Sequence, residues 1–154
     1  MDPSLSLTDW QKNSWLRAHT PSAREIADLF EVADRDLAAC ETPDLHIDWK
    51  FTIAYNAALR LAGAALAAAG FEAERAAHHY RVIQSLELTI GWPPEDIQLL
   101  DTFRKKRNTS GYVMTDTVSS EEAEEIRRLA RRLRSDVRAW LVARHPRLAA
   151  GLSR

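Results

Sequence analysis

The chain has 154 residues, 45% of them hydrophobic, and a formal net charge of −1, which fits one globular domain with a single substantial core. Its only cysteine, Cys40, excludes an intrachain disulfide and a cluster of thiolate ligands for a metal. No secretory signal pattern is present, and Arg60 and Gly63 interrupt the one alanine-rich stretch before it reaches the 18 apolar residues of a membrane span. We therefore expect a cytoplasmic protein without a membrane partner.

The net charge conceals an uneven distribution along the chain. Residues 1–100 hold 8 Lys and Arg against 15 Asp and Glu, a net charge of −7. Residues 101–154 hold 13 against 7, a net charge of +6. This distribution favours a basic surface for phosphates or an acidic partner, and it equally fits two halves of one fold that neutralise each other.

Two helices are predicted in the N-terminal quarter of the chain. Thr8 and Gln11 fit a capping box that opens a short helix running to about residue 19, and Pro21 ends this segment. Ser22 and Glu25 form a second capping box, and the helix that follows has apolar residues at helical spacing. These apolar residues are Ile26, Leu29, Phe30, Ala33 and Leu37.

A long alanine-rich helix is predicted from about residue 48 to residue 69, with Gly70 closing it. Alanine favours helix and lets neighbouring helices approach closely. Residues 71–90 are predicted to form a further helix with His79, Val82 and Ile83 on one side. Gly91 is typical of the residue that follows a helix.

The basic third of the chain is predicted to begin with another helix. The Pro-Pro pair at 93–94 restarts the chain at the first turn of this helix, which ends near the Asn-Thr-Ser-Gly segment at 108–111. Residues 111–118 are the only β-prone run. Because no second strand is predicted to pair with them, we expect an extended connector.

The last predicted element is a long helix that Ser119 and Glu122 open with a third capping box and that stops at His145. The predicted elements make one all-α domain over residues 1–154, an antiparallel up-and-down bundle of five or six helices. Its parts in chain order are a short N-terminal helix (1–20), the bundle (22–145) and a tail (146–154).

Four consecutive basic residues precede the Asn-Thr-Ser-Gly segment: Arg104, Lys105, Lys106 and Arg107. A helix C-terminus favours cations, because its last carbonyl groups carry a partial negative charge, so a basic helix end is one explanation. A phosphate-binding surface is the other explanation.

The last helix carries a second basic group, Arg127, Arg131, Arg134 and Arg138, at spacings of four, three and four along one face. Ion pairs such as Glu124 with Arg128 would make this a solvated, neutralised face. Alternatively, the stripe extends the basic segment 104–107 into a surface that tracks phosphates. No aromatic residue interleaves with these arginines, so base stacking on the stripe is not supported.

His78 and His79 are the only adjacent histidines. Neighbouring helical residues diverge by roughly 100°, so the pair cannot readily chelate one metal, and we expect neither a metal nor a cofactor. Tyr55 and Asn56 in the long helix are expected to be a core aromatic residue and a buried amide. Cys40 has no histidine near it in the sequence to activate it as a nucleophile.

The order of these features resembles the HEPN superfamily, the small helical domains of prokaryotic toxin–antitoxin and antiviral systems. The resemblance covers about residues 20–145. The segments that carry it are Phe-Thr-Ile-Ala-Tyr-Asn-Ala-Ala at 51–58, Gly-Phe at 70–71, Ala-His-His-Tyr-Arg-Val-Ile at 77–83, Arg107-Asn108 leading to Tyr112, and Val-Ser-Ser-Glu-Glu-Ala at 118–123.

The resemblance implies an antiparallel bundle that dimerises and whose active members cleave RNA without a metal. Those members use an arginine, often followed by a polar residue, and a histidine four to six residues further on, with two such motifs meeting across the dimer. Arg107 and Asn108 match the first two positions, and Tyr112 stands in place of the histidine. A guanidinium stabilises the charge that develops when a ribose 2′-OH attacks its phosphate. A tyrosine of ordinary pKa, however, is roughly a thousandfold short of its base form at neutral pH.

Three functions stay open at this point. The first is a HEPN-like protein of a toxin–antitoxin or antiviral defence system, which binds RNA, a cognate antitoxin or a nucleotidyltransferase-type partner through a basic groove between two copies of a homodimer. The second is a metal-independent ribonuclease toxin that uses Arg107, Asn108 and Tyr112, helped by His78 or His79. The third is a non-catalytic helical scaffold or dimerisation protein whose arginines only solubilise it.

Overall fold

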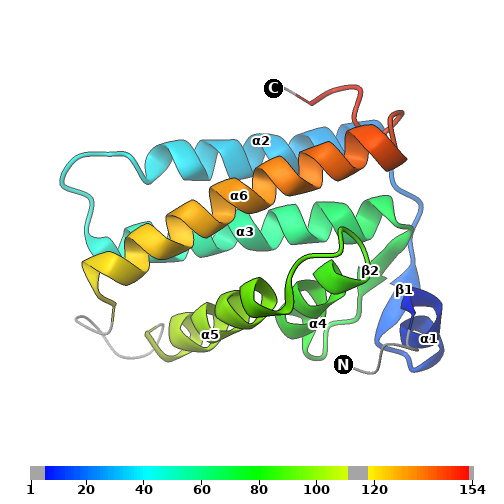
Figure 1. Ribbon diagram of the computed structural model, residues 1–154, viewed down its shortest axis with the longest axis horizontal. Coiled ribbons are helices and arrows are strands. Elements are labelled where there is room, and N and C mark those ends of the chain that lie inside the picture. The colour runs from blue at the N-terminus through cyan, green and yellow to red at the C-terminus, as the bar shows by residue number, and fades with distance from the viewer. Residues whose placement is uncertain (1–5, 111–117, 153–154) are drawn as a thin grey trace.

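The computed structural model describes residues 6–110 and 118–152 and shows a predominantly helical molecule (Figure 1). The helical content confirms the predicted all-α class, with a small two-stranded sheet added to it. In chain order the elements are α1 (Leu7–Lys12), β1 (Leu16–Ala18), α2 (Ala23–Ala39), α3 (Ile47–Ala68), β2 (Phe71–Ala73), α4 (His78–Gln84), the 3-10 helix η1 (Ser85–Glu87), α5 (Pro94–Ser110) and α6 (Ser120–Arg144).

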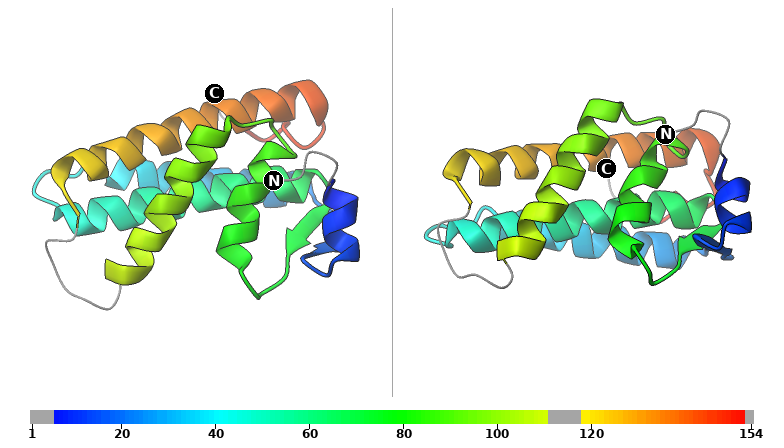
Figure 2. Two further views of the ribbon diagram at one scale, coloured as in Figure 1. Left: turned by 60° about the horizontal axis from the view of Figure 1, so that its bottom comes forward. Right: turned by 90° about the horizontal axis from the view of Figure 1, so that it is seen from below.

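The centre of the molecule is α3. The helices α2 and α6 lie along it, and α4 and α5 cover another of its sides (Figures 1 and 2). The four long helices alternate in direction along the chain, and α6 therefore runs the same way as α3, its main neighbour (Figure 1). The alanines of α3, among them Ala58, Ala62 and Ala65, are fully buried. Their small side chains let helices pack closely on several sides of α3.

The length and apolar composition of α3 would also suit a membrane span, but 67% of its most apolar stretch is buried inside the bundle. A helix that is apolar on all sides is expected at the centre of a packed domain, where it has neighbours all round. The absence of a membrane partner stays a prediction.

Serine caps set the starts of three helices. Ser22 accepts a hydrogen bond from the backbone N–H of Glu25 at 3.1 Å, and Ser119 forms the complete capping box with Glu122, as predicted. The predicted box at Thr8 and Gln11 is wrong. Ser6 and Asp9 form it instead, two residues earlier, because they have the same spacing and a shorter acidic side chain that also reaches the cap backbone.

The predicted first helix also ends sooner than residue 19. It stops at Lys12, since Ser14 takes a left-handed backbone conformation with φ of 62°. The backbone N–H of Trp15 then donates to the carbonyl of Trp10 at 3.0 Å and turns the chain into β1. Residues 16–18 therefore form a strand where a helix was predicted.

The strand β1 pairs antiparallel with β2, with Leu16 opposite Ala73 and Ala18 opposite Phe71. The helix predicted over residues 71–90 is therefore wrong at its start. Gly70, with φ of 98°, ends the turn after α3 in a conformation that glycine adopts without strain, and the chain leaves it as β2. The predicted extended connector at 111–118 lies outside the described residues except for Val118.

Past β2 the chain turns at Ala77, which has φ of 54°, and α4 begins at His78. Pro94 begins α5 as predicted. Phe103 then meets Phe51 of α3 edge to face, with ring centroids 5.5 Å apart at 83°, and this contact fixes α5 against α3. The result is that α4 and α5 lie next to each other on the same part of α3 (Figure 2).

Candidate functional site

The side chains best suited to proton transfer and phosphate binding converge where α3, α4 and α5 meet. Tyr55 comes from the middle of α3, His78 and His79 from the start of α4, and Arg104 and Arg107 from the last turns of α5. We call these five residues the α4–α5 site. The two arginines are three residues apart and so share one face of α5.

Tyr55 of α3 contacts one side chain of α4 and one of α5. Its hydroxyl lies 3.4 Å from Nδ1 of His79, and the guanidinium carbon of Arg107 lies 5.6 Å from the centroid of its ring. The rings of His78 and His79 meet edge to face with centroids 5.8 Å apart. An imidazole and a guanidinium from different helices are thus brought together over one buried phenol.

Burial and charge set the protonation states in the site. Burial raises the pKa of Tyr55 to about 12, although the positive charges of Arg107 and Arg104 act in the opposite direction. Burial also lowers the pKa of His79, and the charges of His78, Arg107 and Arg104 lower it further. At neutral pH the phenol is therefore protonated and the His79 imidazole is neutral, which leaves one of its ring nitrogens able to accept a proton.

A shallow, open depression of about 520 Å³ gives solvent access to this group. Tyr55 is fully buried beneath it, whereas His79 borders it. The lining residues are Arg75, Ala77, His78, His79, Tyr80 and Arg104. The depression combines two arginines, two histidines and an exposed aromatic ring in one place.

Arg104 is held at the edge of this depression by Asp101. The Arg104 Nε donates to Asp101 Oδ1 at 2.7 Å, and Lys105 Nζ lies 3.6 Å from the other oxygen of the same carboxylate. Lys106, on another face of α5, donates to both carboxylate oxygens of Glu122 at 2.8 Å and joins α5 to the start of α6. Arg104 and Arg107 are therefore the members of the basic segment that border the site.

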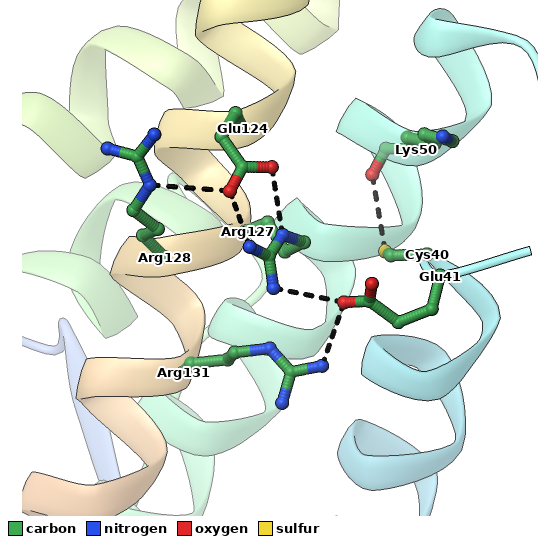
Figure 3. A network of polar contacts seen from close by, with 7 residues as sticks. All are labelled: Cys40, Glu41, Lys50, Glu124, Arg127, Arg128 and Arg131. Atoms are coloured by element: carbon green, nitrogen blue, oxygen red, sulfur yellow. Dashed lines mark hydrogen bonds and ion pairs between the residues drawn. The ribbon is translucent and has the colours of Figure 1, made fainter.

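Three arginines of the α6 stripe pair with carboxylates of α2 and of the turn that follows it, and Figure 3 shows the pairs at Glu41. Glu41 accepts from Arg127 Nη1 at 2.9 Å and from Arg131 Nη2 at 3.0 Å. Asp34 accepts from Arg134 Nη2 at 3.0 Å. These pairs fit the explanation in which the acidic and basic parts of the chain neutralise each other.

Glu124, in the first turns of α6, pairs with Arg128 at 3.3 Å, as the sequence predicts, and also with Arg127, which was not predicted (Figure 3). The hydrogen bond from Arg127 is the main reason that the pKa of Glu124 falls to about 2. Arg138 lies one turn beyond Arg134 on the same helix. A role of the stripe in binding nucleic acid stays a prediction.

The remaining predicted residues have simpler positions. Asn108 belongs to the last turn of α5, and Tyr112 lies outside the described residues. Asn56 is half-buried, not buried as expected. The Cys40 thiol is buried and donates to the carbonyl of Lys50 at 3.5 Å (Figure 3), and burial raises its pKa, so the reactive thiolate is disfavoured.

Sequence reasoning missed Tyr55 and Tyr80 as parts of the site. Tyr55 was expected only as a core residue, and nothing in its spacing indicates a histidine 24 positions away as its partner. A signal for Tyr80 does exist in the sequence, because it follows the histidine pair directly and precedes Arg81. Within residues 6–110 and 118–152, no group of three or more His, Cys, Asp and Glu side chains is placed to hold a metal ion.

Comparisons with protein-family models, with curated proteins and with solved structures give no match to this chain. The function is therefore argued from the site and its chemistry alone.

Proposed function

We propose that the α4–α5 site binds a phosphodiester of RNA and cleaves it by attack of the neighbouring ribose 2′-OH. The observation that carries this proposal is the position of His79 at the edge of an open depression that Arg104 also lines, with Arg107 over the ring of Tyr55 beneath His79. The charges of both arginines help to lower the pKa of His79. The sequence has a tyrosine where the resembled family has its motif histidine. The proposal assigns the proton-accepting role to a histidine from a different helix.

Arg104 and Arg107 supply the phosphate-binding part of the site. A guanidinium presents several N–H donors in a rigid plane that matches the oxygens of a phosphate, and it stays charged at every relevant pH. Their charges also stabilise the additional negative charge on phosphorus oxygens as the 2′ oxygen attacks.

His79 supplies the base. In the tautomer in which Nδ1–H donates to the Tyr55 hydroxyl, Nε2 keeps its lone pair and takes the proton of the 2′-OH. The 2′ oxygen then bonds to phosphorus, and the bond from phosphorus to the 5′ oxygen breaks. The products are a 2′,3′-cyclic phosphate and a 5′-OH end, and the 5′ oxygen takes its proton from water.

The test is cleavage of a short single-stranded RNA with a fluorophore and a quencher at its ends, with and without EDTA. Wild type is compared with Arg107→Ala and His79→Ala, and each variant is expected to lose about a hundredfold or more in rate. Arg24→Ala is the matched control, because the Arg24 side chain on α2 is 90% exposed. Cleavage that persists in both site variants, or that EDTA abolishes, contradicts the proposal.

A second candidate is binding without cleavage, within a HEPN-like homodimer of a toxin–antitoxin or antiviral system. The same two arginines favour it, since they bind phosphate whether or not a base is present. It predicts salt-sensitive RNA binding with an intact product, a dimeric mass by light scattering, and capture of a cognate antitoxin or nucleotidyltransferase from the host. Absence of RNA binding together with a stable dimer supports the helical scaffold instead.

A further inference from the structure

Tyr80 is a large side chain that the fold does not bury. It is 37% exposed and borders the depression beside His79. Two guanidinium groups lie near its ring, with the carbon of Arg81 at 5.6 Å and that of Arg104 at 5.5 Å from its centroid. A partly exposed aromatic ring with two cations nearby is unlike a residue that only fills the core.

Both cations are held by groups other than Tyr80. The Arg81 guanidinium carbon lies 3.7 Å from the ring centroid of Trp15, which is a close stacking contact. The Arg104 guanidinium is fixed by its hydrogen bond to Asp101. These two contacts hold the charges in place independently of the Tyr80 ring. The Tyr80 side chain is partly exposed beside them.

We propose that Tyr80 is a stacking platform for a base of single-stranded RNA, and that Arg81 and Arg104 bind the phosphates on either side of that base. This inference rests on the proposed function and names its substrate class. Bases of a single strand can be splayed out and stacked on an aromatic ring, whereas the bases of a duplex are already stacked on each other. The platform therefore selects unpaired RNA and positions the adjacent phosphodiester near His79.

The dimensions of the site agree with this assignment. A volume of about 520 Å³ lies within the range of sites that hold small organic ligands, roughly 300–1,000 Å³. The depression is open to solvent rather than enclosed, as a strand that enters and leaves requires. His78, which is exposed at its rim, adds a further donor for the sugar or phosphate.

The experiment measures binding of a fluorescent single-stranded RNA and of the corresponding duplex by anisotropy, with 2′-O-methyl riboses so that 2′-OH attack cannot occur. Tyr80→Ala is expected to weaken single-strand binding about 10-fold and to leave duplex binding unchanged, while Tyr80→Phe keeps the wild-type affinity. Trp49→Ala is the matched control. Trp49 is 61% exposed, and it lies two residues from Phe51 and so on roughly the opposite side of α3 from α5.

The outcomes separate this inference from the proposed function. If wild type cleaves RNA but Tyr80→Ala binds single strands as tightly as wild type, the stacking platform is refuted and the cleavage site stands. If Tyr80→Ala weakens single-strand and duplex binding equally, Tyr80 does not select unpaired RNA and the inference is also refuted. If wild type binds neither RNA, the proposed function fails and the inference fails with it.

Discussion

Replacing Tyr55 with phenylalanine removes one oxygen atom from the centre of the candidate site and leaves the packing of the core in place. The side chain is fully buried, and its hydroxyl lies 3.4 Å from Nδ1 of His79. The variant therefore separates the positioning of His79 from the packing of α3.

The expected effect on stability is small. A hydrogen bond within a protein contributes about 0.5–1.5 kcal/mol net, and a contact of 3.4 Å is longer than most, so we expect the lower end, about 0.5 kcal/mol. For a domain of this size that corresponds to a decrease in Tm of roughly 1–2 °C. Differential scanning calorimetry resolves such a change in Tm.

The expected effect on cleavage is larger. Without the hydroxyl, the His79 ring is free to rotate and its tautomer is no longer fixed, so kcat should fall about 10-fold, which equals about 1.4 kcal/mol of transition-state stabilisation. KM should stay near the wild-type value, because Tyr55 is buried and does not reach the depression. An unchanged kcat together with the expected Tm would show that Tyr55 is only a core residue.

Three further predictions concern the fold and the titration of the site. Phe103→Ala should lower the free energy of unfolding by about 3–5 kcal/mol in urea denaturation, since it removes a buried ring packed on Phe51; a loss below 1 kcal/mol would refute this packing. Ser119→Ala should cost about 1 kcal/mol by the same measurement through loss of the α6 cap, and Ser119→Asp should restore most of it. The lowered pKa of His79 means that, below the ordinary imidazole value of 6.5, the unfolded chain binds more protons than the folded one, so stability falls as pH decreases through that range. His79→Gln should reduce this slope, and an unchanged slope in chemical denaturation would contradict the assigned environment.

The elements that the sequence predicts correctly depend on local interactions. The caps at Ser22 and Ser119 each involve residues three positions apart, and the proline at 94 fixes the first turn of α5. The alanine-rich composition of α3 likewise acts within one helix. Each of these signals is complete within a few consecutive residues, so it can be recognised without knowledge of the fold.

The elements that the sequence does not predict depend on distant partners. Residues 16–18 and 71–73 are both too short to be recognised as strands, and each is stabilised by pairing with the other across more than fifty positions. The contact between Tyr55 and His79 is similarly non-local. The sequence singles out Arg107 as a candidate from its segment, but it does not indicate that the neighbours of Arg107 come from α3 and α4.

Residues 71–90 do not form the single helix predicted from the sequence, and this difference places the residues of the site. In a continuous helix from residue 71, His79 would stand about 12 Å along the axis from the start of that helix. Instead β2 runs back along β1, and the left-handed turn at Ala77 starts α4 with the histidine pair in its first turn, next to α5. The small sheet thus fixes where α4 begins, and the position of α4 brings an imidazole within reach of the arginines of α5.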